Sequence, residues 1–346
     1  MIGLFVLGAG LLTPGTVPAA IHGRGLQLPA HLFSGLLRFA ILGVMRRILQ
    51  ALTIAVLAAL AGPAVAPAAK PVVGIADQKP SMFSDARYQA LGIRIVRINV
   101  PWDVLSDPEG LVKLDIWMAG ARSTGARPLV TFDRSPRRPA YNPTNLQMAN
   151  ALLGLRRRYP GLREFSTWNE GNINKRPEIV ARWYRSLRGA CPSCMILAAD
   201  LLDRKNVVSW ARRFTKAAKR TPGHWGLHNY VGINNKSMRS TRAILNAIPG
   251  RFWLTETGGV VSRNNRSQVY FPASAPHAAA VTAFLLGPLA RTFSTRIDRI
   301  YLYHWDIGPS LGPVTWDSAF IGPDNRARPA LTVLAGSLGR TLPAGP

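Results

Sequence analysis

The chain has 346 residues, of which 47% are hydrophobic and 17% are charged, and its formal net charge is +26. A chain of this length and apolar content can bury the core of one large domain, so an intrinsically disordered protein is excluded. The positive charge implies attraction to polyanions. Nucleic acid is the first candidate for an intracellular protein with such a charge, so the compartment decides between partners.

The first 66 residues contain no Asp or Glu. Met45-Arg46-Arg47 forms a charged start, residues 48–60 are almost wholly apolar, and residues 64–66 read Ala-Val-Ala. This order is typical of a secretory signal peptide. We therefore predict a signal peptide at 45–66 and a secreted product, with residues 1–44 either untranslated upstream text or unstructured. The alternative is an uncleaved membrane anchor, although the apolar run is shorter than the ~20 residues of a spanning helix.

Secretion changes the expected partner of the positive charge. Removing residues 1–66 takes away four of the 43 basic residues and no acidic one, which leaves a formal charge of +22. For a secreted protein this charge favours an anionic extracellular glycan over nucleic acid. A solvated basic surface is the competing interpretation, because the arginines are scattered along the chain.

Two cysteines, Cys191 and Cys194, are separated by two residues. In an exported protein this spacing favours a small disulfide over a redox motif, and a zinc site would need further ligands. The six histidines show no metal-site spacing. We therefore expect no metal and no other cofactor.

From residue 70 to residue 346 the chain alternates predicted strands and helices. Eight strand–helix units in about 270 residues predict a single (β/α)₈ TIM barrel domain of the α/β class. A doubly wound sheet is the alternative, but no glycine-rich phosphate loop follows the first strand. The strands are predicted at 72–77, 93–99, 128–133, 164–168, 195–200, 225–230, 252–256 and 299–305. The helices are predicted at 83–91, 114–124, 144–159, 179–188, 207–220, 238–248, 277–292 and 329–338.

Polar side chains stand at or just after the predicted carboxyl ends of the strands. In a (β/α)₈ barrel these positions share the rim where active sites are built. Aromatic rings accompany them and would expose large apolar faces unless a ligand covers them. Sugar rings would use both kinds of group. The polar residues are Asp77, Asn99, Asp133, Asn169, Glu170, Asp200, His228 and Glu256, and the aromatic ones are Trp102, Trp168, Tyr230, Trp305 and Trp316.

Four of these strand ends together resemble the clan A glycoside hydrolases, in particular families 39 and 5. The resemblance covers residues 72 to about 340 and implies retaining hydrolysis of a glycosidic bond. The chain departs from the family pattern at Gly171, where a proline often follows the acid, and this is expected to loosen the loop. The matching residues are Trp168-Asn169-Glu170, His228-x-Tyr230, Thr255-Glu256 and Trp305.

The resemblance implies a role for each carboxylate. Glu170 would be the general acid/base, which needs a raised pKa, and Glu256 would be the nucleophile that stays ionised. Tyr230, with His228 beside it, would hold the nucleophile. Arg97 in the second strand is a candidate partner for Glu256, or else a structural ion-pair partner.

The resemblance also implies contacts with the sugar. Asn169 would hydrogen-bond the 2-hydroxyl, Trp305 would form the platform under the ring, and Trp168 would belong to the same aromatic rim. The predicted function is a secreted glycosidase that hydrolyses a poly- or oligosaccharide by a retaining double displacement. The alternative is a catalytically inactive barrel that binds glycans.

Overall fold

The computed structural model describes residues 45–53, 69–264, 271–309 and 316–343. The chain divides into two compact units, Met1–Pro67 and Ala68–Pro346. In the first unit, residues 45–53 are helical and exposed. Residues 1–44 and most of the predicted signal peptide lie outside the described residues. None of the helices in the described ranges is both long and apolar enough to cross a membrane.

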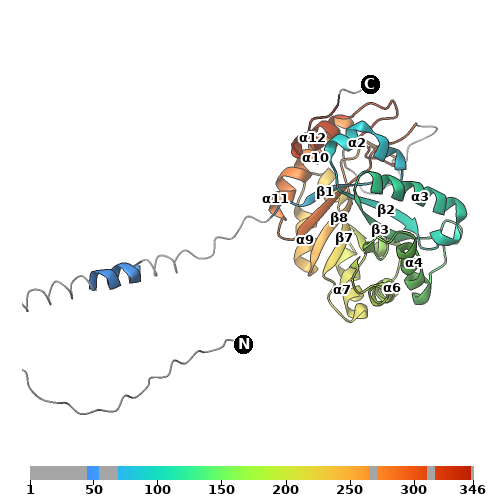
Figure 1. The fold of residues 1–346 in the computed structure, drawn as a ribbon, viewed down its shortest axis with the longest axis horizontal. Coiled ribbons are helices and arrows are strands. Elements are labelled where there is room, and N and C mark those ends of the chain that lie inside the picture. Colours follow the sequence, from blue (N-terminus) through green and yellow to red (C-terminus); the bar gives the residue numbers. More distant parts are fainter. Residues whose placement is uncertain (1–44, 54–68, 265–270, 310–315, 344–346) are drawn as a thin grey trace, which may run out of the picture. The chain divides into compact units, whose positions relative to one another are not determined.

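The second unit is a barrel of parallel strands, which confirms the predicted (β/α)₈ fold (Figure 1). A separate two-stranded antiparallel sheet pairs Ser262–Arg263 (β9) with Trp316–Asp317 (β11). The barrel strands are Val72–Ala76 (β1), Ile95–Pro101 (β2), Arg127–Asp133 (β3), Glu164–Ser166 (β4), Met195–Leu197 (β5), Asp200–Leu202 (β6), His224–His228 (β7), Arg251–Thr257 (β8) and Ile297–Tyr303 (β10).

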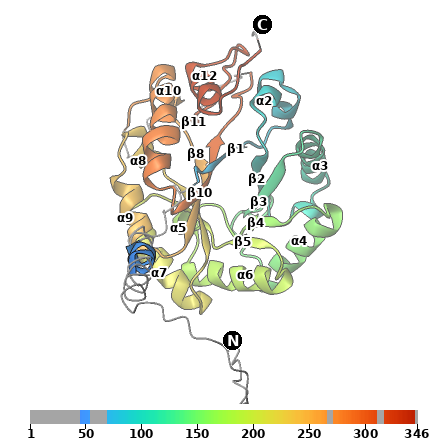
Figure 2. The same ribbon diagram turned by 60° about the vertical axis from the view of Figure 1, so that its left-hand side comes forward.

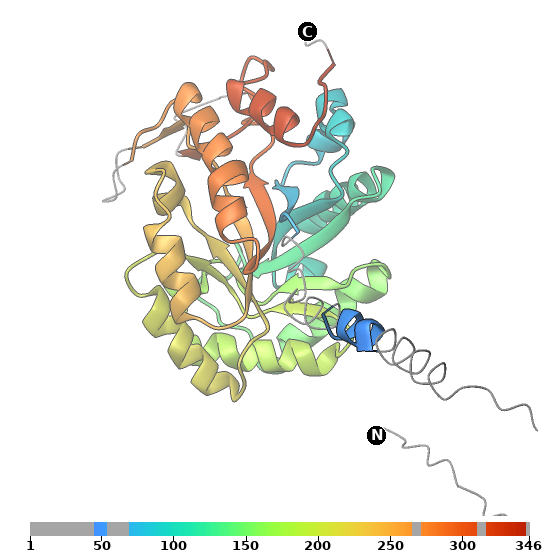
Figure 3. The ribbon, with the colours of Figure 1, turned by 90° about the vertical axis from the view of Figure 1, so that its left-hand side faces the viewer.

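The helices surround the strands (Figure 2), and the C-terminal helix packs beside the helix that follows β9 (Figure 3). Two short 3₁₀ helices, Pro80–Ser84 and Val104–Ser106, follow β1 and β2. The α-helices are Ala86–Leu91 (α2), Pro108–Ser123 (α3), Asn145–Arg158 (α4), Gly171–Asn174 (α5), Pro177–Ala190 (α6), Val207–Ala218 (α7), Tyr230–Asn234 (α8), Arg239–Ala247 (α9), Ala275–Phe284 (α10), Ala290–Thr292 (α11) and Pro329–Ser337 (α12).

A single stretch of chain closes the barrel. The strand order is β5-β4-β3-β2-β1-β10-β8-β7-β6, so the two ends of the sheet are β5 and β6, which only Ala198 and Ala199 separate. Ala198 N donates to His224 O on β7, and Asp200 N donates to Trp168 O beyond β4. The segment predicted as one strand at 195–200 therefore pairs with β4 through β5 and with β7 through β6. The barrel thus has no unpaired edge.

Local sequence sets several helix boundaries. Thr144 and Gln147 form a reciprocal capping box at the start of α4, and Asp85 accepts a hydrogen bond from Arg87 N at the start of α2. The helix predicted at 277–292 is not continuous, because a π-helical segment, Leu285–Leu289 (η3), interrupts it. Pro288 lies in this segment and has no N–H to donate, which disrupts the α-helical ladder.

The interior of the barrel is filled in layers. Side chains alternate along β2, so Ile95 and Arg97 face the interior, whereas Val96 and Ile98 join the larger core that also contains helix residues. A polar layer around Arg97 lies nearer the carboxyl ends of the strands, which is the end where barrel active sites form. The apolar interior layer consists of Ala76, Ile95, Leu129, Leu197, Trp253 and Tyr301.

Cys191 and Cys194 form a disulfide between the end of α6 and the start of β5. The cross-link closes a loop with a sequence separation of 3, so it constrains this turn rather than distant parts of the chain.

Candidate active site

Arg97 on β2 is the centre of a buried polar cluster. Its side chain is fully buried. Nη1 donates to Glu256 Oε2 at 3.0 Å, and Nη2 donates to Asp200 Oδ2 at 2.6 Å and to Asn169 Oδ1 at 2.9 Å. Nε donates to Thr131 Oγ1 at 3.1 Å. Because a guanidinium presents its donors in a rigid fork, Arg97 fixes groups from several strands in one geometry.

Asp200 at the start of β6 is the buried counterion of Arg97. It also accepts a hydrogen bond from Ser166 Oγ at 2.7 Å. Gly226 on β7 makes room for it, since a Cβ there would lie 2.0 Å from Asp200 Oδ1. Burial alone would raise the pKa of Asp200, but Arg97 and His228 outweigh burial and lower it. A negative charge is therefore held inside the barrel.

His228 at the end of β7 connects this cluster to Glu170. His228 Nδ1 lies 3.1 Å from Glu170 Oε1, and Nε2 lies 3.7 Å from Asp200 Oδ2. Burial opposes a charge on the imidazole, but Glu256, Asp200 and Glu170 outweigh burial and raise the pKa of His228 to about 9. His228 is therefore an imidazolium at neutral pH.

Glu170 follows β4 in a left-handed backbone conformation with φ 45°, which is uncommon for a residue other than glycine. Burial would raise the pKa of Glu170, but the hydrogen bond and charge of His228 outweigh it and lower the pKa. The predicted raised pKa of Glu170 is thus wrong in direction, because the hydrogen bond and charge of His228 favour the ionised carboxylate. Gly171, where a looser loop is predicted, is buried, and a Cβ there would lie 3.3 Å from the Trp210 ring.

Glu256 near the end of β8 receives one donor on each carboxylate oxygen. Arg97 Nη1 donates to Oε2 at 3.0 Å and the Tyr230 hydroxyl donates to Oε1 at 3.2 Å. Burial, together with the charge of Glu256, raises the pKa of Tyr230 well above its ordinary value. Tyr230 therefore remains a neutral phenol that can donate, and the two donors orient the Glu256 carboxylate.

Glu170 and Glu256 line one cavity of about 260 Å³ at the carboxyl ends of the strands. The rings of Tyr230 and Trp316 meet edge to face there, with centroids 4.8 Å apart. The cavity thus combines two carboxylates with aromatic walls. Its other lining residues are Leu202, Arg204, Val231, Arg263, Phe271 and Tyr303.

Trp305 is not on the wall of this cavity, so its predicted role as the sugar platform is wrong. It is 1% exposed, packs edge to face against Tyr88 of α2, and donates from Nε1 to Asp85 Oδ2 at 3.0 Å. Strand β10 ends at Tyr303, so the chain has left the rim before it reaches Trp305. Tyr303 lines the cavity instead. The period-two alternation of side chains along β10 indicates this position, because Tyr301 also faces the interior.

Trp168 is also buried, so the prediction that it contacts the sugar is wrong. Its ring packs against Trp183 of α6 with centroids 4.6 Å apart, and the Lys175 ammonium lies 5.2 Å from the ring centroid. Trp102, another predicted rim aromatic, is buried and stacks on Tyr141. The local sequence of a strand does not reveal which other segment covers its tryptophan, so these assignments could not be excluded before the tertiary structure was known.

Asn169 and two other strand-end residues position the rim. Asn169 Oδ1 accepts from Arg97, and its Nδ2 donates to Asp133 Oδ2 at 3.2 Å. Asp77 Oδ2 accepts from the backbone N–H of Trp305 at 2.8 Å. In the described ranges, no group of His, Cys, Asp and Glu side chains could hold a metal ion.

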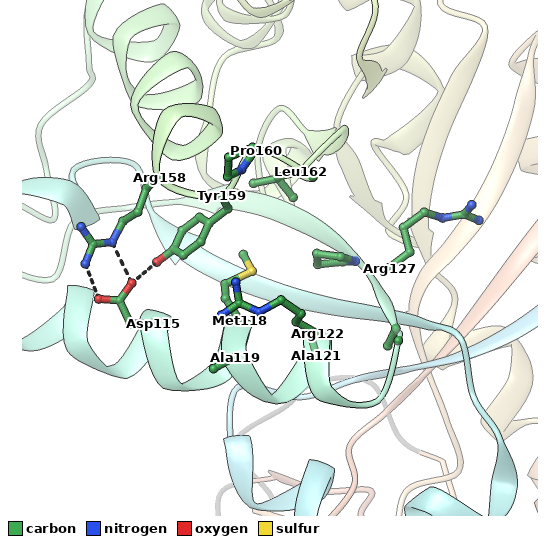
Figure 4. A pocket seen from close by; sticks show the side chains of 14 residues that line it. Asp115, Met118, Ala119, Ala121, Arg122, Arg127, Arg158, Tyr159, Pro160 and Leu162 are labelled. Carbon is green, nitrogen blue, oxygen red and sulfur yellow. Dashed lines mark hydrogen bonds and ion pairs between the residues drawn. The ribbon is translucent and has the colours of Figure 1, made fainter.

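A larger hollow of about 950 Å³ lies at the amino ends of the strands, beside α3 and the end of α4 (Figure 4). Its acidic side chain is already engaged, because Asp115 Oδ1 accepts from Arg158 Nε and from the Tyr159 hydroxyl, each at 2.7 Å. Barrel enzymes build their active sites at the opposite rim. We therefore assign the candidate active site to the smaller cavity.

No model of a protein family matches the sequence, and no curated protein matches it. The fold does match solved structures. An intracellular xylanase from Thermoanaerobacterium saccharolyticum, in complex with xylotriose, matches with a TM-score of 0.54 and 11% identity, over 79% of this chain and 99% of that chain. A fungal β-1,4-galactanase matches with a TM-score of 0.58 and 15% identity, over 77% and 99%.

A glucosidase from Croceicoccus marinus matches with a TM-score of 0.57 and 12% identity, over 80% of this chain and 69% of that chain. A further match is a psychrophilic family 10 endo-β-1,4-xylanase. At such low identity these likenesses establish the barrel fold. They do not single out families 39 and 5 among glycoside hydrolase barrels.

Proposed function

We propose that the protein is a glycoside hydrolase that cleaves O-glycosidic bonds of a poly- or oligosaccharide by a retaining double displacement. The observation that carries this proposal is that Glu170 and Glu256, from two different strand ends, line one aromatic cavity and have separate partners. The matches to xylanases, a galactanase and a glucosidase support the same reaction class.

In the first step Glu256 attacks the anomeric carbon while the bond to the leaving oxygen breaks. Glu170 supplies the proton that this oxygen needs. A bound sugar excludes water from the cavity, and charged groups are then costly. The proton on His228 Nδ1 consequently shifts to Glu170 Oε1, 3.1 Å away, which leaves both groups neutral. Glu170 then passes the proton to the leaving oxygen.

In the second step Glu170, now ionised again, takes a proton from water, and the water oxygen attacks the anomeric carbon. The ester bond to Glu256 breaks and the carboxylate is released. Arg97 and Tyr230 hold Glu256 throughout. Asn169 uses one Nδ2 proton on Asp133, so its second proton is the one we assign to the sugar 2-hydroxyl.

We also propose that this enzyme is secreted after removal of residues 45–66, on the sequence pattern alone. N-terminal sequencing of protein recovered from the culture medium tests this proposal. A chain that begins just after Ala66 is expected, and a product that keeps the apolar segment would contradict it.

The reaction is tested by incubating the mature protein with a glycan panel and measuring reducing-end release and product anomer. Glu256→Ala should abolish turnover, and azide should restore cleavage with inverted stereochemistry. Glu170→Ala should retain activity on substrates with good leaving groups. Glu109→Ala is the matched control, since this carboxylate is exposed and pairs only with Lys113 among the described residues.

Two results would overturn the proposal. Wild-type protein that releases no sugar from any glycan, but still binds one, would favour the inactive glycan-binding barrel. Variants of Glu170 and Glu256 that are as active as Glu109→Ala would show that the cleavage uses other groups.

A further inference from the structure

The cavity contains two cations that the catalytic carboxylates do not engage. Arg204 follows β6 and Arg263 lies on β9, and both line the cavity. Glu256 is already bound by Arg97 and Tyr230, and Glu170 is bound by His228, as described above. The positive side chains that compensate the two carboxylates, Arg97 and His228, thus lie in the barrel interior.

Neither arginine has a carboxylate partner in the described part of the chain. Two acidic residues near them, Asp203 before Arg204 in sequence and Asp317 opposite Ser262 in the small sheet, are engaged elsewhere. Asp203 accepts hydrogen bonds from the backbone of Val231 and Gly232 at the start of α8. Asp317, beside Trp316, pairs with Arg328 at 2.6 Å. All 17 Asp and Glu residues of the chain lie in the described ranges, Arg204 is exposed and Arg263 is half-buried, so both guanidinium groups are open to an anion from outside the chain.

Arg263 is held in the wall of the cavity. Its guanidinium carbon lies 4.0 Å from the centroid of the Phe271 ring, and its strand partner across the small sheet is Trp316. Stacking on an aromatic face fixes a guanidinium plane while its N–H edge remains available for a planar anion. Arg204 approaches from the β6 side, so the two cations belong to different segments of the wall.

A second basic hollow has a volume of about 320 Å³. Arg134 from the loop after β3, with Lys175 and Arg176 from the segment after α5, lines it. Burial and the nearby charge of Arg134 lower the pKa of Lys175, although Asp133 opposes the shift. Basic side chains therefore line a second hollow besides the cavity that contains Glu170.

We propose that the substrate is an acidic glycan whose carboxylate or sulfate group binds Arg204 and Arg263 in the cavity. This inference rests on the proposed glycosidase function and adds the substrate class to it. A sugar acid or a sulfated sugar would supply the missing counterion. The formal charge of +22 after residue 66 would raise the local concentration of such a polymer.

The test uses Arg204→Gln and Arg263→Gln, with Arg182→Gln as a control that removes one exposed charge on α6 outside the cavity. Hydrolysis is compared on polygalacturonate, glucuronoxylan, a sulfated galactan and the neutral xylan and galactan. We expect wild-type kcat/KM to be higher on an acidic polymer. Each cavity variant should lower the acidic-to-neutral ratio by about 10- to 100-fold, the range for loss of a charged hydrogen bond. Arg182→Gln should keep the wild-type ratio.

Binding gives a readout that is independent of turnover. Titration of Glu256→Gln with oligogalacturonate, sulfated oligogalactan and xylo-oligosaccharide should show tighter binding of one acidic ligand, and Arg263→Gln in that background should remove the difference. The acidic ligand that binds distinguishes carboxylate from sulfate. Hydrolysis of neutral polymers with equal or better efficiency, and no preference in binding, would overturn this inference and leave the glycosidase proposal intact. Acidic-ligand binding without hydrolysis of any polymer would instead support the inference and refute the glycosidase.

Discussion

Arg97→Met separates the structural and catalytic parts of the buried cluster. The substitution keeps much of the side-chain volume but removes the guanidinium from fully buried Asp200. Breaking one partner out of a buried ion pair costs about 3–5 kcal/mol of unfolding free energy. We expect the lower end, about 3 kcal/mol, because the His228 imidazolium still lies 3.7 Å from Asp200. This corresponds to a fall in Tm of about 6–12 °C for a domain of this size class.

The loss should depend on pH in a defined direction. In the wild type the pKa of Asp200 is lowered, so its stabilising contribution is present above the unfolded pKa of about 3.9 and is lost as the pH falls. In Arg97→Met burial is less well offset and the pKa of Asp200 rises. The deficit relative to wild type should therefore be largest near pH 7 and should shrink as the pH falls toward 4. Urea unfolding at several pH values measures it.

The double variant Arg97→Met/Asp200→Asn provides the control. It removes the uncompensated charge and should recover about half or more of the lost stability, because a neutral amide costs less to bury than a carboxylate. Activity should not return, since Glu256 still lacks its 3.0 Å donor. A single variant within about 0.5 kcal/mol of wild type, or a double variant no more stable than the single one, would refute this account of the cluster.

The remaining predictions concern the proton, the nucleophile and the aromatic walls. The His228–Glu170 pair should lose its proton near pH 9, because the pKa of His228 is raised to about 9. In the wild type, kcat/KM should therefore fall as the pH rises through 9. If kcat/KM of His228→Gln still falls near pH 9, the proton does not come from His228. Because the folded pKa of His228 is raised, its stabilising contribution should be complete below about pH 6.5 and should be lost as the pH rises through 9, which urea titrations can follow. Tyr230→Phe should lower kcat/KM by about 10- to 100-fold, since it removes a donor to the nucleophile; an unchanged kcat/KM would remove Tyr230 from the site. Trp305→Ala should cost about 3–5 kcal/mol of unfolding free energy because the ring is in the core. Trp316→Ala should instead weaken sugar binding, with a small effect on Tm. Denaturation and ligand titration measure both, and the reverse pattern would restore Trp305 as the sugar platform.

Several residues that line the cavity beside Glu170 and Glu256 were not predicted from the sequence. Tyr303 follows the interior residue Tyr301 at the period-two spacing of a strand, so the alternation along β10 predicts that both side chains lie on the same face. Arg204, Arg263 and Phe271 lie in β9 or in irregular segments. Their local sequence does not indicate where their side chains point. Irregular backbone and the short strand β9 have no repeating pattern that assigns side chains to one face.

The sequence by itself determined the barrel, because eight alternating strands and helices have few other ways to bury their apolar faces. It also determined that Glu170 and Glu256 would share a rim, because parallel strands end on the same side. Tertiary structure decided which of the rim residues reach the cavity. The sequence predicts Trp305 as the sugar platform and Trp168 as a substrate-contacting rim residue, but Tyr88 and Trp183 on neighbouring helices cover them. Tertiary structure also decided the direction of the pKa shift of Glu170, since Asp200, His228 and Arg97 come from three different strands. Asp200 helps to raise the pKa of His228, and the hydrogen bond and charge of His228, with the charge of Arg97, then outweigh the effect of burial on Glu170.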